Sequence, residues 1–171
     1  LHSGIAAGAD IILIPEIPFS IDRVCEAVLA NYSAGKPCNI IAVAEGAVLD
    51  SEAPYKKKER AFARASRGET TVTAHLAEVI GERTGAETRA TVLGYIQRGG
   101  NPSAYDKALS TRLGSYAGML AKEGKFGVTV AVAGSKITFN ALQDVAGKYK
   151  LVDPASEIVR AAEDIGVCMG R

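Results

Sequence analysis

Short apolar runs alternate with stretches of helical periodicity along most of the chain, and this alternation restricts the possible folds more than any other feature. Strands are predicted at residues 11–14, 39–44, 88–93, 127–132 and 136–139, and helices at residues 20–35, 70–85, 101–124 and from 153 onward. Strands that alternate with helices form parallel sheets, because each helix returns over the sheet in a right-handed crossover. We therefore predict an α/β fold of three αβα layers around a mostly parallel sheet.

Two details of the later helices follow from local residue types. Asn101 and Pro102 have the types that suit an N-cap and a first helical position, so we expect the fourth helix to start there. In the last helix the spacing of Ile158, Ala162 and Ile165 predicts a face that packs against the core.

Composition and charge exclude several classes of protein. Hydrophobic residues make up 47% of the chain, which is enough for a sizeable core, and the formal net charge is +1. A general nucleic-acid binder is more basic, and no apolar run is long enough to span a membrane, so we predict neither partner. Cys25, Cys38 and Cys168 form no CxxC pair and are not spaced with the histidines as metal ligands. We therefore expect no metal site in this chain and a reducing, cytoplasmic location.

Two loops follow predicted strands at the edge of the sheet where ligands bind in open α/β folds. Glu45 comes directly after the strand at 39–44, and residues 94–100 follow the strand at 88–93. In the second loop Arg98 offers a fork of donors, and the two glycines after it allow a close backbone approach. This pattern predicts a small-anion site with a carboxylate nearby for hydroxyl groups. The alternative is a plain loop with a surface charge.

Residues 87–106 carry the most specific motif, Glu-Thr-Arg-Ala-Thr-Val-Leu-Gly-Tyr-Ile-Gln-Arg-Gly-Gly-Asn-Pro-Ser-Ala-Tyr-Asp. This run resembles the signature segment of the phosphofructokinases, and so long a run is far more specific than a bare glycine motif. Residues 4–16, the Ala-Glu-Gly at 44–46, and residues 145–154 are similar to other parts of the same family. The chain therefore resembles the C-terminal half of a 6-phosphofructokinase.

The resemblance implies a glycolytic phosphotransferase that phosphorylates the 1-hydroxyl of fructose 6-phosphate to give fructose 1,6-bisphosphate. It assigns Glu45 to the sugar hydroxyls and Arg98 to the 6-phosphate in the same subunit. It also implies that Arg89 reaches the 6-phosphate bound by a neighbouring subunit, and hence a homodimer or homotetramer. Tyr95 stands where the family usually has histidine; its hydroxyl can donate a hydrogen bond but carries no positive charge.

The family's glycine-rich donor loop and its Thr-Ile-Asp-Asn-Asp segment do not occur in this sequence. We therefore expect no catalytic residue here, Mg²⁺ bound mainly through an absent N-terminal half, either ATP or pyrophosphate as donor, and no activity from the isolated chain. Since Leu1 lies within a helical pattern, we expect a longer polypeptide. By the resemblance, residues 1–171 are its C-terminal part. About 1–100 and 150–171 form a sugar-phosphate-binding lobe, and about 101–149 pack on the N-terminal lobe. The alternative is a non-catalytic sugar-phosphate-binding or assembly domain.

Residues 46–68 form a polar stretch rich in positive charge. The basic side chains are those of Lys56, Lys57, Lys58, Arg60, Arg64 and Arg67, interleaved with Tyr55 and Phe62. They could contact phosphate, nucleic acid or an acidic partner. Because the overall charge is balanced, we predict a solvated surface insertion instead.

Overall fold

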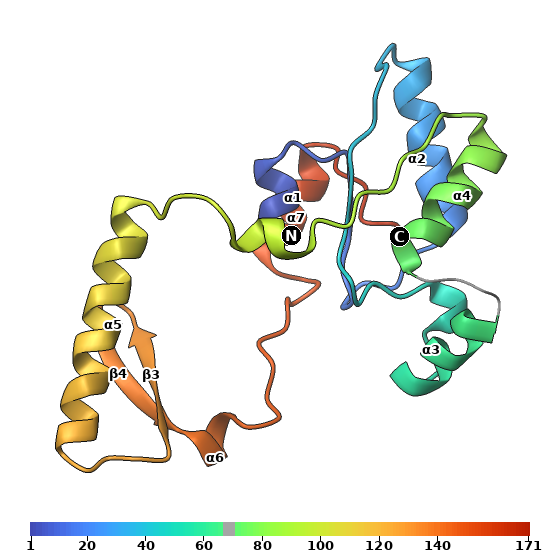
Figure 1. The fold of residues 1–171 in the computed structure, drawn as a ribbon. Coiled ribbons are helices and arrows are strands. Elements are labelled where there is room, and N and C mark those ends of the chain that lie inside the picture. Colours follow the sequence, from blue (N-terminus) through green and yellow to red (C-terminus); the bar gives the residue numbers. More distant parts are fainter. Residues whose placement is uncertain (67–70) are drawn as a thin grey trace. The chain divides into compact units, whose positions relative to one another are not determined.

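The structure is a computed structural model that describes residues 1–66 and 71–171 (Figure 1). The chain divides into two compact units: unit 1 comprises Leu1–Val92 and Leu151–Arg171, and unit 2 comprises Leu93–Lys150. Two features of the sequence analysis, Arg67 of the basic stretch and Thr70 as a possible helix start, lie outside the described residues.

A parallel pair of strands forms the centre of unit 1. Strand β1 (Ile11–Leu13) pairs with β2 (Ile41–Val43), with Ile11 opposite Ile41 and Leu13 opposite Val43. On the other side of β1, the Ile12 N–H donates to the Cys168 carbonyl at 2.9 Å, so residues near the C-terminus extend the ladder. Because β1 has neighbours on both sides, all its residues are buried, whereas those of β2 are half-buried.

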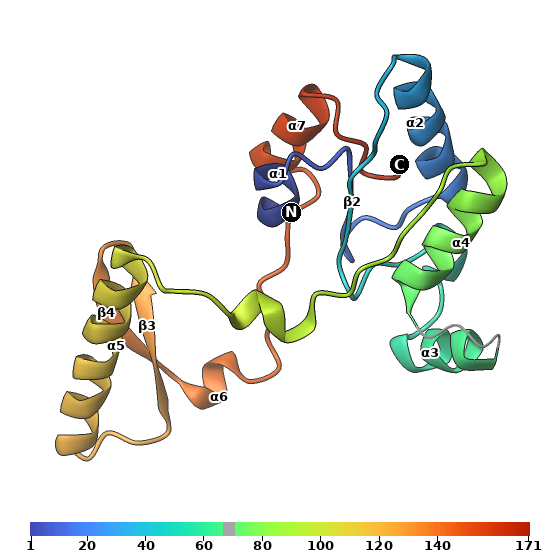
Figure 2. The ribbon, with the colours of Figure 1, turned by 45° about the horizontal axis from the view of Figure 1, so that its top comes forward.

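Helices α2 (Ile21–Ser33) and α4 (Val72–Thr84) cover one face of this sheet and lie side by side in both ribbon views (Figures 1 and 2). They form one buried cluster with the odd-numbered residues of β1, and Val24, Val28, Leu76 and Ile80 are among its members. The limits of α4 follow from local chemistry: the Thr71 side chain accepts a hydrogen bond from the Ala74 N–H, and Gly85 ends the helix with a φ of +70°.

Helices α1 (His2–Ala6) and α7 (Glu157–Asp164) cover the opposite face, where Ile12 and Ile14 form a second buried cluster with Val159 and Met169. The order helix, sheet, helix confirms the predicted three αβα layers for unit 1. The predicted inward face of the last helix is wrong in part. Ala162 is buried as predicted. The other buried residue of the helix is Val159 and not Ile158, and Ile165 is 73% exposed. The helix begins later than Asp153 and ends at Asp164, so that Ile165 lies beyond its last residue, and Val159 is the residue that packs in the buried cluster.

The segment at 88–93 is not a strand, contrary to the sequence prediction. A strand exists only where a neighbouring backbone pairs with it. Here the Thr88 hydroxyl donates instead to the Ala77 carbonyl of α4 at 2.7 Å. A cavity of about 210 Å³, whose walls include Ile41, Leu76, Thr88 and Arg89, lies between this segment, β2, α2 and α4. Within the described residues, the outer edge of β2 therefore has no paired strand.

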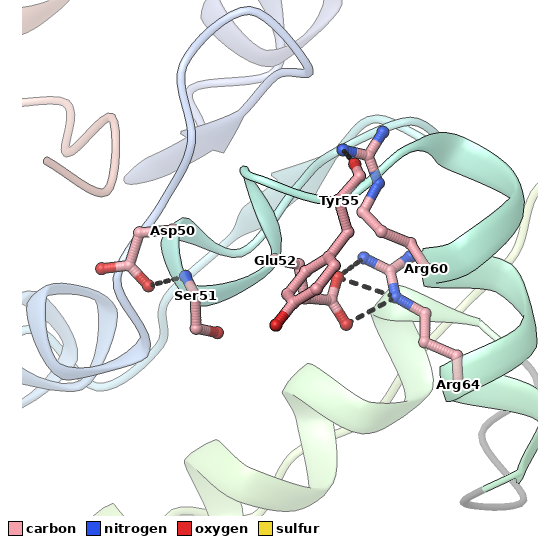
Figure 3. Close-up of polar contacts among 6 residues, drawn as sticks. All are labelled: Asp50, Ser51, Glu52, Tyr55, Arg60 and Arg64. Carbon is pink, nitrogen blue, oxygen red and sulfur yellow. Dashed lines mark hydrogen bonds and ion pairs between the residues drawn. The ribbon is translucent and has the colours of Figure 1, made fainter.

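The polar stretch after β2 folds into a short 3-10 helix, η1 (Asp50–Glu52), and helix α3 (Lys57–Ser66). Figure 3 shows the Arg64 guanidinium against the Glu52 carboxylate, and the Arg60 side chain donates to the Tyr55 carbonyl at 2.9 Å. The side chains of Arg64 and Glu52 are only 17% and 11% exposed. The prediction of a solvated surface therefore holds for Lys56, Lys57 and Lys58, which are exposed, and is wrong for Arg64.

Unit 2 contains the 3-10 helix η2 (Gly94–Arg98), helix α5 (Ala104–Lys122), the antiparallel hairpin β3 (Val128–Ala133) and β4 (Lys136–Ala141), and the short helix α6 (Leu142–Val145). Gly134 lies in the turn of this hairpin with a φ of +60°. The predicted start of α5 is wrong. Ser103 is the N-cap, since its hydroxyl accepts from the Asp106 N–H while the Asp106 carboxylate accepts from Ser103. These two reciprocal bonds give hydrogen-bond acceptors to two backbone N–H groups at the start of the helix, whereas Asn101 could cap only one.

Candidate functional site

Glu45 lies at the carboxyl end of β2, as predicted, and its side chain is exposed. The turn that carries it is held on both sides by backbone hydrogen bonds. Before it, the Ala44 N–H donates to the Leu13 carbonyl at 2.9 Å; after it, the Phe19 N–H donates to the Val48 carbonyl at 2.9 Å. The backbone of Glu45 is therefore held in place before any ligand arrives, and its exposed carboxylate can accept hydrogen bonds from hydroxyl groups.

The loop after β1 meets this turn. A Cβ atom added to Gly46 would lie 3.0 Å from the Cγ atom of Pro15, so the two loops are in contact. Next to Pro15, the half-buried Glu16 accepts a hydrogen bond on its Oε1 from the Val152 N–H at 3.1 Å. The sequence analysis assigned no role to Glu16. Its position in the sequence could have indicated a role, because Glu16 comes two residues after a predicted strand, at the same sheet edge as Glu45.

Arg89 is paired with a carboxylate two residues away. Its Nη2 and Nε atoms lie 2.6 and 3.0 Å from Oε1 of Glu87. Both side chains are largely exposed, so the pair contributes little to stability. An exposed pair is also easily exchanged for another anion, and the guanidinium of Arg89 therefore stays available to a phosphate.

Tyr95 and Arg98 lie on η2, between two glycines with positive φ, Gly94 at +50° and Gly100 at +89°. Such φ values favour glycine, because a Cβ atom would be strained there. Tyr95 is 89% exposed, and Arg98 is exposed as well. Within the part of the chain that the structure describes, no hydrogen bond or ion pair occupies either side chain. Their donors are therefore free for an anion.

The four predicted site residues are divided between the two units. Glu45 and Arg89 belong to unit 1, and Tyr95 and Arg98 belong to unit 2. Glu45 lies at a strand end and Tyr95 and Arg98 lie in the loop at 94–100, as expected, whereas Arg89 lies on a segment that is not the predicted strand. Their assembly into one site stays a prediction.

The described residues contain neither a cluster of metal-binding side chains nor a helix suited to a membrane. Over residues 1–66 and 71–171, no group of three or more His, Cys, Asp or Glu side chains could hold a metal ion. No helix in the same ranges is both long enough and apolar enough to cross a bilayer. The donor set of this chain therefore does not form a Mg²⁺ site of three or more such ligands among the described residues.

The sequence matches known proteins over nearly its whole length. The profile of the family described as Phosphofructokinase matches residues 1–121. The chain is 40% identical over 170 residues to "ATP-dependent 6-phosphofructokinase 3" of Bacteroides thetaiotaomicron, covering 99% of this chain and 46% of that protein. It is 42% identical over 156 residues to "Pyrophosphate--fructose 6-phosphate 1-phosphotransferase" of Amycolatopsis methanolica, covering 90% of this chain and 45% of that one.

Solved structures agree with these matches. The phosphofructokinase of Saccharomyces cerevisiae superimposes with a TM-score of 0.63 at 30% identity, over 83% of this chain and 18% of that chain. A pyrophosphate-dependent phosphofructokinase from Marinobacter aquaeolei gives a TM-score of 0.64 at 19% identity, over 95% of this chain and 41% of that chain. At this level of identity the match supports the fold alone. The chain spans about half the length of the curated relatives that it matches. On the family profile, the relatives and the αβα layers together, the chain belongs to the phosphofructokinase family.

Proposed function

We propose that this chain is the fructose 6-phosphate-binding part of a 6-phosphofructokinase, which transfers a phosphoryl group to the sugar's 1-hydroxyl. One observation carries the proposal: the free guanidinium of Arg98 lies in a glycine-flanked loop within the family's signature segment. A phosphate is the ligand that such a fork of donors binds best. The two relatives described above are named as an ATP-dependent 6-phosphofructokinase and a pyrophosphate-dependent fructose 6-phosphate phosphotransferase, which supports fructose 6-phosphate as the acceptor.

Each predicted residue has a distinct role in this proposal. The Glu45 carboxylate accepts hydrogen bonds from sugar hydroxyls, and Arg98 with the Tyr95 hydroxyl donates to the 6-phosphate of the same subunit. Arg89 leaves Glu87 and donates to the 6-phosphate bound by a neighbouring subunit in a homodimer or homotetramer. The 6-phosphate is thereby held at a fixed distance from the 1-hydroxyl, which must lie in line with the donor phosphate.

The remaining chemistry belongs to the other half of the enzyme in this proposal. The donor, ATP or pyrophosphate, the catalytic base and the ligands of Mg²⁺ lie there, and the metal ion supplies neutralisation of the donor phosphates. The sugar-phosphate lobe comprises residues of about 1–100 and 150–171. Residues of about 101–149 pack on the other half, which is supported by the exposed aromatic rings of Tyr105, Phe126 and Tyr149. The location of the enzyme is the cytoplasm.

A second candidate function is favoured by the observed pair of Arg89 with Glu87. If the guanidinium of Arg89 only pairs with Glu87, it does not bind a phosphate in a second subunit. The chain would then be a non-catalytic domain that binds a sugar phosphate or serves assembly.

A coupled assay separates the two candidates. The complete enzyme, with this chain joined to its other half, should form fructose 1,6-bisphosphate with ATP or with pyrophosphate, and the isolated chain should form none. Glu45→Gln should raise the KM for fructose 6-phosphate in the complete enzyme. If fructose 6-phosphate binds but neither donor yields product, the non-catalytic domain is the correct interpretation.

A further inference from the structure

We propose that Glu16 is a positioning residue of the sugar-phosphate site. By accepting a hydrogen bond from the Val152 N–H, its carboxylate joins the sheet edge that carries Glu45 to the chain that returns from unit 2. This inference rests on the proposed function, and it concerns a residue that does not itself contact the reacting groups.

The first step of the argument is the position of Glu16 at the edge of the sheet. The register of β1 and β2 offsets paired residues by thirty positions, as Ile11 opposite Ile41 shows. Continued past the strands, this register sets Glu16 level with Gly46, directly after Glu45. The near contact of Gly46 with Pro15 agrees with that continuation. Glu16 and Glu45 therefore belong to the same edge, on loops that touch.

The second step is the bond that Glu16 makes. Its Oε1 accepts the Val152 N–H at 3.1 Å, although the two residues are 136 positions apart. The Val152 side chain packs against the buried cluster of Ile12 and Ile14, so the amide is held in place from the other side. A carboxylate that accepts from a backbone amide at a half-buried position makes a stronger bond than two neutral groups do.

The third step concerns where the chain goes from Val152. The chain leaves unit 1 after Val92 and returns at Leu151, and Tyr95 and Arg98 lie on the excursion between these points. Val152 is thus the second residue after the return. Glu16 fastens this return point to the edge that bears Glu45, so that one end of the excursion that carries Tyr95 and Arg98 is anchored in unit 1. Binding then orders fewer segments and costs less conformational entropy.

The consequence is a specific kinetic signature. Loss of the bond should weaken binding of the sugar phosphate without altering the groups that perform phosphoryl transfer. We expect Glu16→Ala in the complete enzyme to raise the KM and the calorimetric Kd for fructose 6-phosphate about tenfold, with kcat within about twofold of wild type. Glu16→Gln should restore both constants to within about twofold, because a glutamine side-chain oxygen still accepts from an N–H.

Two further measurements separate positioning from general stability. Hydrogen–deuterium exchange at the Val152 amide should accelerate in Glu16→Ala and not in Glu16→Gln. The matched control is Asp10→Ala, which removes a carboxylate that accepts from the Ile40 N–H at 2.8 Å, at the opposite end of the same two strands. This control should lower the melting temperature and leave the Kd unchanged.

The inference is overturned if Glu16→Ala leaves the Kd unchanged, or if Asp10→Ala raises it equally. It is also overturned if Glu16→Gln behaves as Glu16→Ala, since an acceptor for the Val152 N–H would then not be sufficient for the role. A wild-type enzyme that binds fructose 6-phosphate but transfers no phosphoryl group overturns the proposed function alone, because the Kd values still decide the role of Glu16. A wild-type enzyme that does not bind the sugar overturns both.

Discussion

Arg64 donates from Nε and Nη2 to the carboxylate of Glu52, and this ion pair fastens helix α3 to the segment that follows the Glu45 turn (Figure 3). Among the described residues, Glu52 is the one charged residue that is buried as a whole, and its side chain is 11% exposed. A carboxylate at such a position depends on charge-assisted hydrogen bonds, because their loss is not made up by water.

Arg64→Met should therefore lower the free energy of unfolding by about 3 kcal/mol, because the Glu52 carboxylate loses the charge-assisted hydrogen bonds from Arg64. Urea denaturation of the wild-type and variant chains measures the difference. The double variant Glu52→Gln with Arg64→Met should recover part of the loss, since a neutral amide is less costly than a carboxylate at this position. Equal stabilities of wild type and the single variant would show that the pair is solvated after all.

Arg98→Ala should raise the KM for fructose 6-phosphate about thirtyfold, which corresponds to about 2 kcal/mol for a charge-assisted clamp. The matched control is Arg23→Ala on α2, where the guanidinium forms an exposed pair with Glu26 at 3.2 Å. Steady-state kinetics of the complete enzyme provide both values. If the two variants have the same KM, Arg98 does not bind the phosphate.

Arg89 should act on the neighbouring subunit, and mixing two inactive variants tests this. Subunits with Arg89→Ala and subunits with Glu45→Ala complement each other, since some sites then receive both intact groups. Random exchange in a dimer should restore about one quarter of wild-type activity. A mixture of Arg89→Ala with the double variant serves as the control and should stay inactive. Mixed oligomers without activity would mean that Arg89 does not act in trans.

The cysteines should differ in reactivity toward Ellman's reagent, because only the thiolate form attacks it. Burial raises the pKa of the Cys25 thiol, an effect that the Arg83 charge opposes and the Asp22 charge reinforces. Cys38 is exposed. We expect Cys38 to react first in the native chain and Cys25 only on unfolding; Cys38→Ser should abolish the fast phase. A fast phase that survives this substitution contradicts the assignment.

Acid should destabilise unit 1 through Asp10. Burial acts to raise the pKa of this carboxyl, but hydrogen bonds from Lys36 and the Ile40 N–H, with the Lys36 charge, outweigh it and hold the pKa below its usual range. A carboxyl with a lowered folded-state pKa stabilises the fold above its unfolded pKa and loses that contribution as the pH falls through the folded value. Melting temperatures between pH 6 and about pH 2.5 should therefore fall more steeply for wild type than for Asp10→Asn. Parallel curves would refute this.

Local patterns in the sequence predicted the elements whose causes are local. Strand β1, helix α2 and helix α4 with its terminal Gly85 were foreseen, because periodicity and helix ends depend on neighbouring residues. The strand at 88–93 was not, since strand formation depends on a partner backbone that sequence patterns do not contain. The start of α5 was missed although Ser103 and Asp106 have capping-box spacing, because Asn101-Pro102 offered a competing signal.

The candidate site divides in the same way. Glu45 could be located because it follows a strand directly, and Arg98 because it lies in the loop after a strand-like run. Arg89 pairs with Glu87, a residue only two positions away, so this contact needs no distant part of the chain. Glu16 could not be assigned, because its hydrogen-bond partner lies 136 residues away and only the folded chain brings the two together.

Strand β1 supplies both cores of unit 1, since Ile11 and Leu13 enter one cluster while Ile12 and Ile14 enter the other. Deleting or inserting a single residue within it would turn every following side chain to the opposite face and exchange the two sets. Homologous proteins should therefore keep this stretch at constant length, whereas the η1–α3 region, outside both clusters, can gain or lose residues. Gaps in the family are expected to fall after Leu49 and never between Ala9 and Ile14.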